Sequence, residues 1–265
     1  MMKLLYRIPC VLLIMLCGLN TSIAHAKDRI IKTATQQVLT VDQLVEELLS
    51  ADIVLLGEIH NDRSHHEAQR LLLEKTAKQR AGGSVVLEML MPSQQKAINE
   101  VQQWFHQGGK SGLRSLAEKI NWNHAWDWRQ YKEIMNMLLH QSAAIVAGSP
   151  DDAELKANHA FVPTGKYSGQ ESVKMALTQL IQAQHKNDEN LVALQQYKDY
   201  KMARQLQGAK KPAWLIAGNI HVSKQLGVPL FLQDNHFSGK LKVLMMVESK
   251  LLPDVNHADY LWITQ

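Results

Sequence analysis

The feature that most constrains the fold of this chain is the alternation of short apolar runs with longer stretches of helical periodicity. The apolar runs have strand length and span residues 52–57, 84–89, 143–148, 213–218, 241–247 and 260–264. Between them, apolar residues recur at helical spacing, for example in 64–79, in 97–105 and after Trp128. Continuous apolar strands separated by helices are typical of a parallel sheet that is covered on both faces. We therefore predict an α/β fold with a mostly parallel central sheet flanked by helices, and we place the last strand at a sheet edge.

A long interval separates the third strand-like run from the fourth. It covers about 151–211, is polar and mostly helical in pattern, and contains a Gly/Pro loop at 163–169. We interpret it as a helical insertion at one end of the sheet, serving as a lid or an interaction surface rather than as a separate domain. Before it, a Trp-rich turn at 122–128 is expected to pack in the core, as large aromatic side chains usually do.

The first 26 residues have the features of a cleavable secretory signal. Lys3 and Arg7 give a positive start, an apolar run covers 8–19, and Ala-His-Ala at 24–26 places small residues at the positions that a signal peptidase reads. The apolar run is shorter than the roughly 20 residues that cross a bilayer, which argues against a membrane anchor. We predict a signal peptide at 1–26 and export of one domain, 27–265, to the periplasm, with association with the outer membrane left open.

Cleavage at this position removes both cysteines, Cys10 and Cys17. The exported domain would then have no thiol for a disulfide, a nucleophile or a metal ligand. The alternative is a lipoprotein signal at Cys17, but Leu16 stands where a small residue normally precedes a lipidated cysteine. Loss of Lys3 and Arg7 lowers the net charge by two from +4, so the chain has no basic surplus that would predict a nucleic-acid partner.

Carboxylate and imidazole side chains follow three of the predicted strands. Glu58 and His60 follow the first strand, Glu88 ends the second, and His221 follows the fourth in a Gly-Asn-Ile-His segment similar to the Gly-Glu-Ile-His segment of the first. Ligands of parallel α/β sheets bind outside the carboxyl ends of the strands, so we expect these side chains to converge on one crevice. Strand alternation places Glu58 and His60 on the same face.

Two kinds of chemistry fit this cluster. Two imidazoles and two carboxylates form a plausible first shell for a divalent metal. Alternatively, Glu58, His60 and His221 provide a histidine base with an orienting carboxylate, as a hydrolase needs. A third interpretation is a hydrogen-bonded structural network inherited with the fold.

The segment after His60 is interpreted as the start of a helix. Asp62 or Ser64 is expected to cap this helix by accepting a backbone hydrogen bond. His65 and His66 lie in its first turn, where we expect them to be exposed to solvent.

Four segments of the chain together carry a family resemblance. They are IVLLGEIHNDRSHHEAQRLLLE, VVLEMLMPSQQ, QQYKDYKMA and WLIAGNIHVSKQLGVP, in this order between Ile53 and Pro229. They resemble the ChaN family of haem-binding, iron-regulated bacterial envelope proteins, which is similar in turn to the wider Tiki/TraB and erythromycin-esterase-like group. The resemblance implies an α/β fold, haem bound as a cofacial pair between two subunits, and a role in haem or iron acquisition. It also implies that a tyrosine holds the iron while His and Lys of the partner subunit contact the propionates.

The residues that would hold haem then fall in the insertion. Tyr167 lies in the Gly/Pro loop, and a tyrosinate oxygen is a suitable ligand for ferric iron. Tyr197 and Tyr200 compete for this role, but they belong to a family-like Gln-x-x-x-Asp-x-x-Met-Ala helix, where we expect them to pack. His185 and Lys186 form a cationic pair able to meet propionates.

We therefore predict a haem-binding envelope protein that stores or passes haem during iron uptake. Haem is the expected ligand, and a divalent metal at the strand-end cluster is kept open. The expected partners are a second copy of the chain on haem binding and an outer-membrane haem receptor or a periplasmic haem carrier. The alternative function is a metal-dependent or His/Glu-based hydrolase that uses the strand-end cluster.

Overall fold

The computed structural model describes residues 28–184, 190–250 and 252–264. The predicted signal peptide at 1–26 and the predicted propionate contacts His185 and Lys186 lie outside the described residues. Within the described ranges, no helix combines the length and apolar character needed to cross a membrane.

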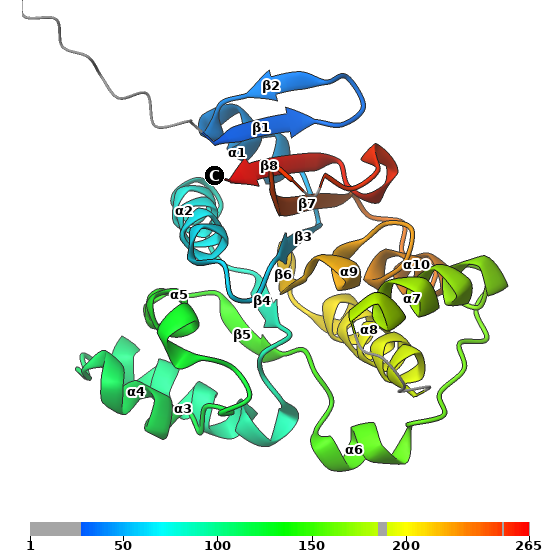
Figure 1. The fold of residues 1–265 in the computed structure, drawn as a ribbon. Helices are drawn as coiled ribbons and strands as arrows, with labels where there is room; N and C mark the ends of the chain where they lie inside the picture. Colours follow the sequence, from blue (N-terminus) through cyan, green and yellow to red (C-terminus); the bar gives the residue numbers. More distant parts are fainter. Residues whose placement is uncertain (1–27, 185–189, 251, 265) are drawn as a thin grey trace, which may run out of the picture.

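The described residues form one sheet of eight strands at the centre of the molecule (Figure 1). The strands are β1 (Arg29–Lys32), β2 (Gln37–Leu39), β3 (Ile53–Glu58), β4 (Ser84–Leu87), β5 (Ala144–Ala147), β6 (Ala213–Gly218), β7 (Leu241–Glu248) and β8 (Tyr260–Thr264). Their order across the sheet is β2-β1-β8-β7-β3-β6-β4-β5. The run from β8 to β5 is parallel, whereas β1 is antiparallel to both β8 and β2. The predicted mostly parallel sheet is confirmed.

Helices cover both faces of this sheet (Figure 1). One face packs against α1 (Val41–Leu49), α2 (Arg63–Gln79), α3 (Gln95–His106), α4 (Leu113–Lys119) and α5 (Trp128–His140). The other face packs against α8 (Leu191–Gly208), α9 (Asn219–Val222) and α10 (Val228–Asp234). Two short 3₁₀ segments, η1 (Pro92–Gln94) and η2 (Val255–His257), lie in the connections between these elements.

The predicted helical insertion lies between β5 and β6. It contains α6 (Asp152–Ala157), α7 (Glu171–Gln184) and α8. α8 packs against α10 and closes one face of the sheet, while α7 lies outside α8 and forms a small apolar cluster with Leu226 and Leu230. The insertion is therefore part of the main fold on the α8 side and is peripheral on the α7 side.

The prediction of β8 as an edge strand is wrong. β8 lies between β7 and β1, because the N-terminal β1 pairs with it in antiparallel register, with Ile30 opposite Trp262. β1 and β2 have only four and three residues, and each contains just two adjacent apolar residues, too few for the sequence pattern to predict a strand. The edges of the sheet are β2 and β5.

The Trp-rich turn packs into the core, as expected. Trp122 is buried, and Trp126 and Trp128 pack against the same apolar cluster. The indole N–H of Trp122 donates to the carbonyl of Trp126 at 2.8 Å, and that of Trp128 donates to the carbonyl of Leu113 at 3.0 Å. These bonds satisfy the polar edges of two large rings and fix the start of α5.

Strand β3 is the centre of the sheet and is buried on both faces. Leu55 belongs to the apolar cluster beneath α8 and α10, whereas Leu56 belongs to the cluster beneath α2 and α5. Neither side chain has any exposed surface. Burial of each leucine contributes about 1.5–3 kcal/mol to the free energy of folding.

We expect Leu55→Ala and Leu56→Ala to lower the free energy of unfolding by similar amounts, about 2–5 kcal/mol each, because each leaves a cavity in a closed core. Val38→Ala is the matched control, because Val38 is 56 % exposed at a sheet edge and should change the free energy by less than about 0.5 kcal/mol. Urea denaturation measures all three. A small effect at Leu55 alone would contradict the burial of both faces.

Candidate functional site

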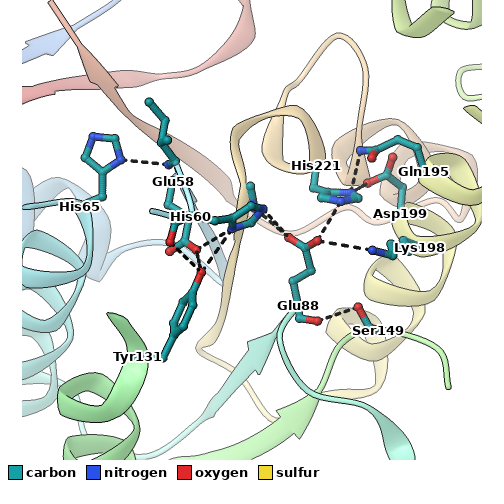
Figure 2. A network of polar contacts seen from close by, with 12 residues as sticks. Glu58, His60, His65, Glu88, Tyr131, Ser149, Gln195, Lys198, Asp199 and His221 are labelled. Carbon is teal, nitrogen blue, oxygen red and sulfur yellow. Dashed lines mark hydrogen bonds and ion pairs between the residues drawn. The ribbon is translucent and has the colours of Figure 1, made fainter. Parts of the chain in front are cut away.

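The four strand-end side chains converge at the carboxyl edge of the sheet (Figure 2). β6 pairs with both β3 and β4, so the ends of these three strands lie side by side. Glu58, Glu88 and His221 are buried, and the His60 side chain is 39 % exposed. Glu88 lies between the two imidazoles, 3.9 Å from His60 Nε2 and 3.1 Å from His221 Nε2. The structure thus brings together all four residues of the predicted cluster.

Glu58 is held by donors from three elements. Its Oε1 accepts a hydrogen bond from the Tyr131 hydroxyl at 2.6 Å and lies 2.9 Å from His60 Nδ1. Its Oε2 accepts a hydrogen bond from the Gln69 amide at 2.8 Å and lies 3.3 Å from His66 Nε2. Burial alone would raise the pKa of Glu58, but the contacts from His60 and His66 hold this pKa well below its usual value.

The histidines at the start of α2 are buried, so the expectation that they are exposed is wrong. His65 has no exposed surface: its Nδ1 accepts the backbone N–H of Ile59 at 3.0 Å, and its Nε2 lies 3.0 Å from the Thr264 hydroxyl. His66 packs on the Tyr131 ring with 4.6 Å between ring centroids. The reason is that α2 lies against the sheet from its first turn. Asp62 caps this helix as predicted, by accepting the backbone N–H of Ser64 at 2.8 Å.

Glu88 links β4 to β6 and to the short helix α9. Its Oε2 accepts the backbone N–H of Gly218 at 2.9 Å, and Lys198 Nζ of α8 lies 3.9 Å from Oε1. Burial would raise the pKa of Glu88, but the positive charges around it, His221 first among them, hold the pKa well below its usual value. Glu88 is therefore an anion at the centre of the site.

His221 lies between two carboxylates. Its Nε2 faces Glu88, its Nδ1 is 2.6 Å from Asp199 Oδ1, and the Gln195 amide lies 2.9 Å from the same nitrogen (Figure 2). Burial would lower the pKa of His221, but Glu88 and Asp199 raise it to about 10. Burial also raises the pKa of Asp199 to about 6, because His221 offsets only part of the desolvation. At neutral pH the ring is an imidazolium that is neutralised by its neighbours.

Both carboxylates of this cluster accept hydrogen bonds from buried donors, which limits the chemistry open to them. Glu58 orients His60, whose ring is partly exposed and also meets the edge of Trp126, with 4.8 Å between centroids. Burial would lower the pKa of His60, but Glu58 and Glu88 raise it. Among the residues that the structure describes, no group of three or more His, Cys, Asp or Glu side chains is arranged to hold a metal ion. The hydrogen bonds and ion pairs of Glu58, Glu88 and His221 join β3, β4 and β6 to α2, α5, α8 and α9.

Sequence reasoning missed several members of this network. Tyr131 and Gln69 carry no sequence signal for contact with Glu58, because both lie within ordinary amphipathic helices. Lys198 likewise carries no sequence signal for its contact with Glu88. Asp199 did have one, because it is the acid of the Gln-x-x-x-Asp-x-x-Met-Ala segment that resembles the family.

A separate groove lies on the other side of α9. It has a volume of about 940 Å³ and runs between α7, the segment from α9 to α10, the end of β7 and η2. Val173, Ala176 and Leu180 of α7 form one apolar wall, and Ile220, Leu226 and Leu230 contribute to the others. Lys224 and His257 add polar groups to the lining.

Tyr167 lines this groove. Its side chain is half-buried and packs against the apolar cluster of α7, and Lys166 Nζ lies 5.4 Å from its ring centroid. The competing tyrosines are engaged elsewhere. Tyr197 is buried and donates to Glu154 at 2.7 Å, and burial followed by this bond raises its pKa to about 12. Tyr200 packs between Phe161 and Phe231.

Residues 44–232 match the family model described as haem-binding uptake, Tiki superfamily, ChaN. This chain belongs to the ChaN family. The match spans more than half of the sequence and confirms the resemblance carried by the four segments. No protein among those with curated functions matches the chain.

A solved structure agrees with this membership. The structure described as cofacial haem binding to ChaN of Campylobacter jejuni is 27 % identical to this chain, covers 90 % of it and 97 % of its own length, and gives a TM-score of 0.82. Two other structures are more distant. A Bacillus cereus protein is 9 % identical, gives a TM-score of 0.48, and covers 79 % of this chain and 70 % of its own length. An erythromycin esterase EreC mutant is 15 % identical, gives a TM-score of 0.46, and covers 84 % of this chain and 77 % of its own length. These two carry no argument about function.

We expect Tyr131→Phe to lower the free energy of unfolding by about 1.5–3 kcal/mol, because it removes a hydrogen bond to a buried carboxylate. Tyr200→Phe is the matched control, since its hydroxyl accepts a hydrogen bond from the exposed Arg204, and it should cost less than about 0.5 kcal/mol. Chemical denaturation at neutral pH compares them. Equal effects would show that the Glu58 bond contributes nothing to stability.

The raised pKa of His221 predicts a pH dependence of stability. Folded His221 binds its proton more tightly than the unfolded chain does, so its contribution is complete below pH 6.5 and is lost as the pH rises toward about 10. We expect the free energy of unfolding to fall in this window with a slope of up to about 1.4 kcal/mol per pH unit. His221→Asn should flatten the slope, whereas His124→Asn, at an exposed position, should not. An unchanged slope in His221→Asn would refute the assignment.

Proposed function

We propose that this protein binds haem in the groove beside α7, with Tyr167 as the iron ligand. The proposal rests on one observation: this chain, which belongs to the ChaN family, has a mainly apolar groove that is lined by the half-buried Tyr167. The hydrolase alternative has less support, because the matching family is one of haem-binding proteins and the carboxylates of the strand-end cluster are committed to buried donors.

The groove suits a large, flat and mainly apolar ligand. Its volume of about 940 Å³ falls within the range of roughly 300–1,000 Å³ that is usual for ligand sites. Aliphatic side chains on facing elements can contact both faces of a macrocycle. Lys224, paired with Asp259 at 2.8 Å, and His257 provide polar groups for the carboxylate edge of such a ligand.

Tyr167 fits the role of ligand because it combines a fixed position with a hard oxygen donor. A phenolate suits ferric iron, and tyrosine is an established axial ligand of haem. Bound haem would supply the iron centre, and the chain would supply the phenolate oxygen and the apolar walls. His185 and Lys186 follow α7 directly in the sequence, and we propose that they contact the propionates of haem held by a partner subunit.

We further propose that haem binding joins two copies of the chain. Exposed apolar side chains occur on the helix that borders the groove: Met175 is 55 % exposed and Leu180 is 40 % exposed. Val255, in the segment η2 that borders the groove through Asn256 and His257, is 46 % exposed. A second copy that covered these side chains would remove apolar surface from water. Cofacial haem binding to ChaN of Campylobacter jejuni supports this arrangement.

The site of action proposed for the protein is the periplasm, and association with the outer membrane is left open. The charged start, apolar run and Ala-His-Ala sequence of residues 1–26 support export. In this compartment the protein would store haem or pass it between an outer-membrane receptor and a periplasmic carrier.

We expect the protein without residues 1–26 to bind haemin stoichiometrically, giving a Soret band and the charge-transfer absorption of a phenolate–iron bond. Tyr167→Phe should abolish the phenolate signature and weaken binding, while Tyr197→Phe and Tyr200→Phe should leave the signature unchanged. Titration followed by absorption and light scattering measures ligation and size together.

Two results would contradict the proposal. Absence of saturable haemin binding would remove the function. Binding with an unchanged phenolate signature in Tyr167→Phe would keep the function but move the ligand to another residue.

A further inference from the structure

The loop that carries Tyr167 is fastened to the core by one carboxylate. Asp234 Oδ1 accepts the backbone N–H of Tyr167 at 2.7 Å, and Asp234 Oδ2 accepts the backbone N–H of Ser168 at 2.9 Å. Within the loop, the N–H of Gly169 donates to the carbonyl of Gly165 at 3.0 Å. The carboxylate therefore bridges two consecutive amides, and one of them belongs to the proposed iron ligand.

The close approach of this carboxylate requires glycine at position 165. A Cβ atom at Gly165 would lie 1.9 Å from Asp234 Oδ2 and 2.2 Å from Cγ. The Asp234 side chain would have to turn away, because two non-bonded atoms cannot occupy that distance. A substitution at Gly165 therefore disrupts the same contact without changing the carboxylate or the phenol.

The position of Asp234 is not explained by the stability of its own helix. It is the last residue of α10, where the helix dipole opposes a negative charge. Two amide donors from the loop offset this cost, since hydrogen bonds to an ionised acceptor are stronger than neutral ones. The placement points to a role outside α10.

α10 is a rigid base for such a contact. Its residues Val228 to Leu232 are buried, and Phe231 packs against Tyr200 of α8. The same helix contributes Leu230 and Gln233 to the wall of the groove. One element therefore carries both a wall of the groove and the carboxylate that fixes the tyrosine loop.

We propose that Asp234 is the positioning residue for Tyr167: by holding the Tyr167 and Ser168 amides, it sets the place of the phenol oxygen relative to the groove wall on α10. This inference rests on the proposed haem ligation by Tyr167. A loop that is ordered before haem arrives does not lose conformational freedom on binding, so the contact increases affinity without touching the ligand.

The test compares Asp234→Ala, Asp234→Asn and Gly165→Ala with Tyr167→Phe, using the protein without residues 1–26 and haemin as the probe. Gly112→Ala is the control, because a Cβ at Gly112 meets no atom within 4 Å. Thermal unfolding of the haem-free variants confirms that each is folded. Resonance Raman spectra report the iron–phenolate vibration, and titration reports the dissociation constant for haemin.

We expect Asp234→Ala and Gly165→Ala to weaken haemin binding about 10-fold, the size expected for loss of hydrogen bonds to a charged acceptor, and to weaken or broaden the iron–phenolate band. Asp234→Asn, which retains one acceptor oxygen, should lie between Asp234→Ala and the unchanged protein. Gly112→Ala should match the unchanged protein.

The outcomes separate this inference from the proposed function. If Tyr167→Phe loses the band while Asp234→Ala and Gly165→Ala keep both band and affinity, Tyr167 is the ligand but Asp234 does not position it. If Tyr167→Phe keeps the band, the proposed ligation itself fails. A loss of affinity in Asp234→Ala with a fully unchanged band would also overturn the positioning role, because it would show a contribution unrelated to the phenolate.

Discussion

The carboxylate of Glu88 is the group on which the arrangement of this protein depends most. It is buried just after β4, accepts the backbone N–H of Gly218, the last residue of β6, and faces the two imidazoles of the site. A buried anion is costly unless it is paired and hydrogen-bonded, so the strand ends and α9 are held where they can supply those partners. The polar edge of the sheet is thus as closely specified as its apolar centre.

In the buried network, each charged side chain is neutralised by neighbouring side chains of opposite charge rather than by solvent. Glu58 and Glu88 are anions, His221 is a cation between Glu88 and Asp199, and His60 faces both glutamates from the partly exposed side. Removing one member leaves its neighbour buried without a counter-charge, which costs more than the contact itself gains. This mutual pairing explains how so many ionisable groups can be buried together in a network that is separate from the apolar groove.

The sequence predicted the elements whose signals are local. Strand length, helical spacing and the rule that parallel strands end at one edge are enough to predict that Glu58, His60, Glu88 and His221 converge. Tertiary contacts decided the rest. The prediction of β8 as an edge strand is wrong because its partner β1 has only four residues, too few for a strand pattern. The prediction of His66 as exposed is wrong because nothing in the sequence shows that α2 lies against Glu58. The contact of Asp234 with the loop that carries Tyr167 depends on how α10 packs beside that loop, which the sequence does not show.

The short helix α9 has consequences for how this groove can change. His221 faces the charged network, while Asn219 and Ile220 of the same four residues line the groove. A substitution in α9 that reshaped the groove would also move an imidazolium away from two carboxylates. Adaptation to a ligand of another size is therefore expected to occur through α7 and η2, where side chains can vary without disturbing any buried charge, and α9 should remain the fixed side of the groove.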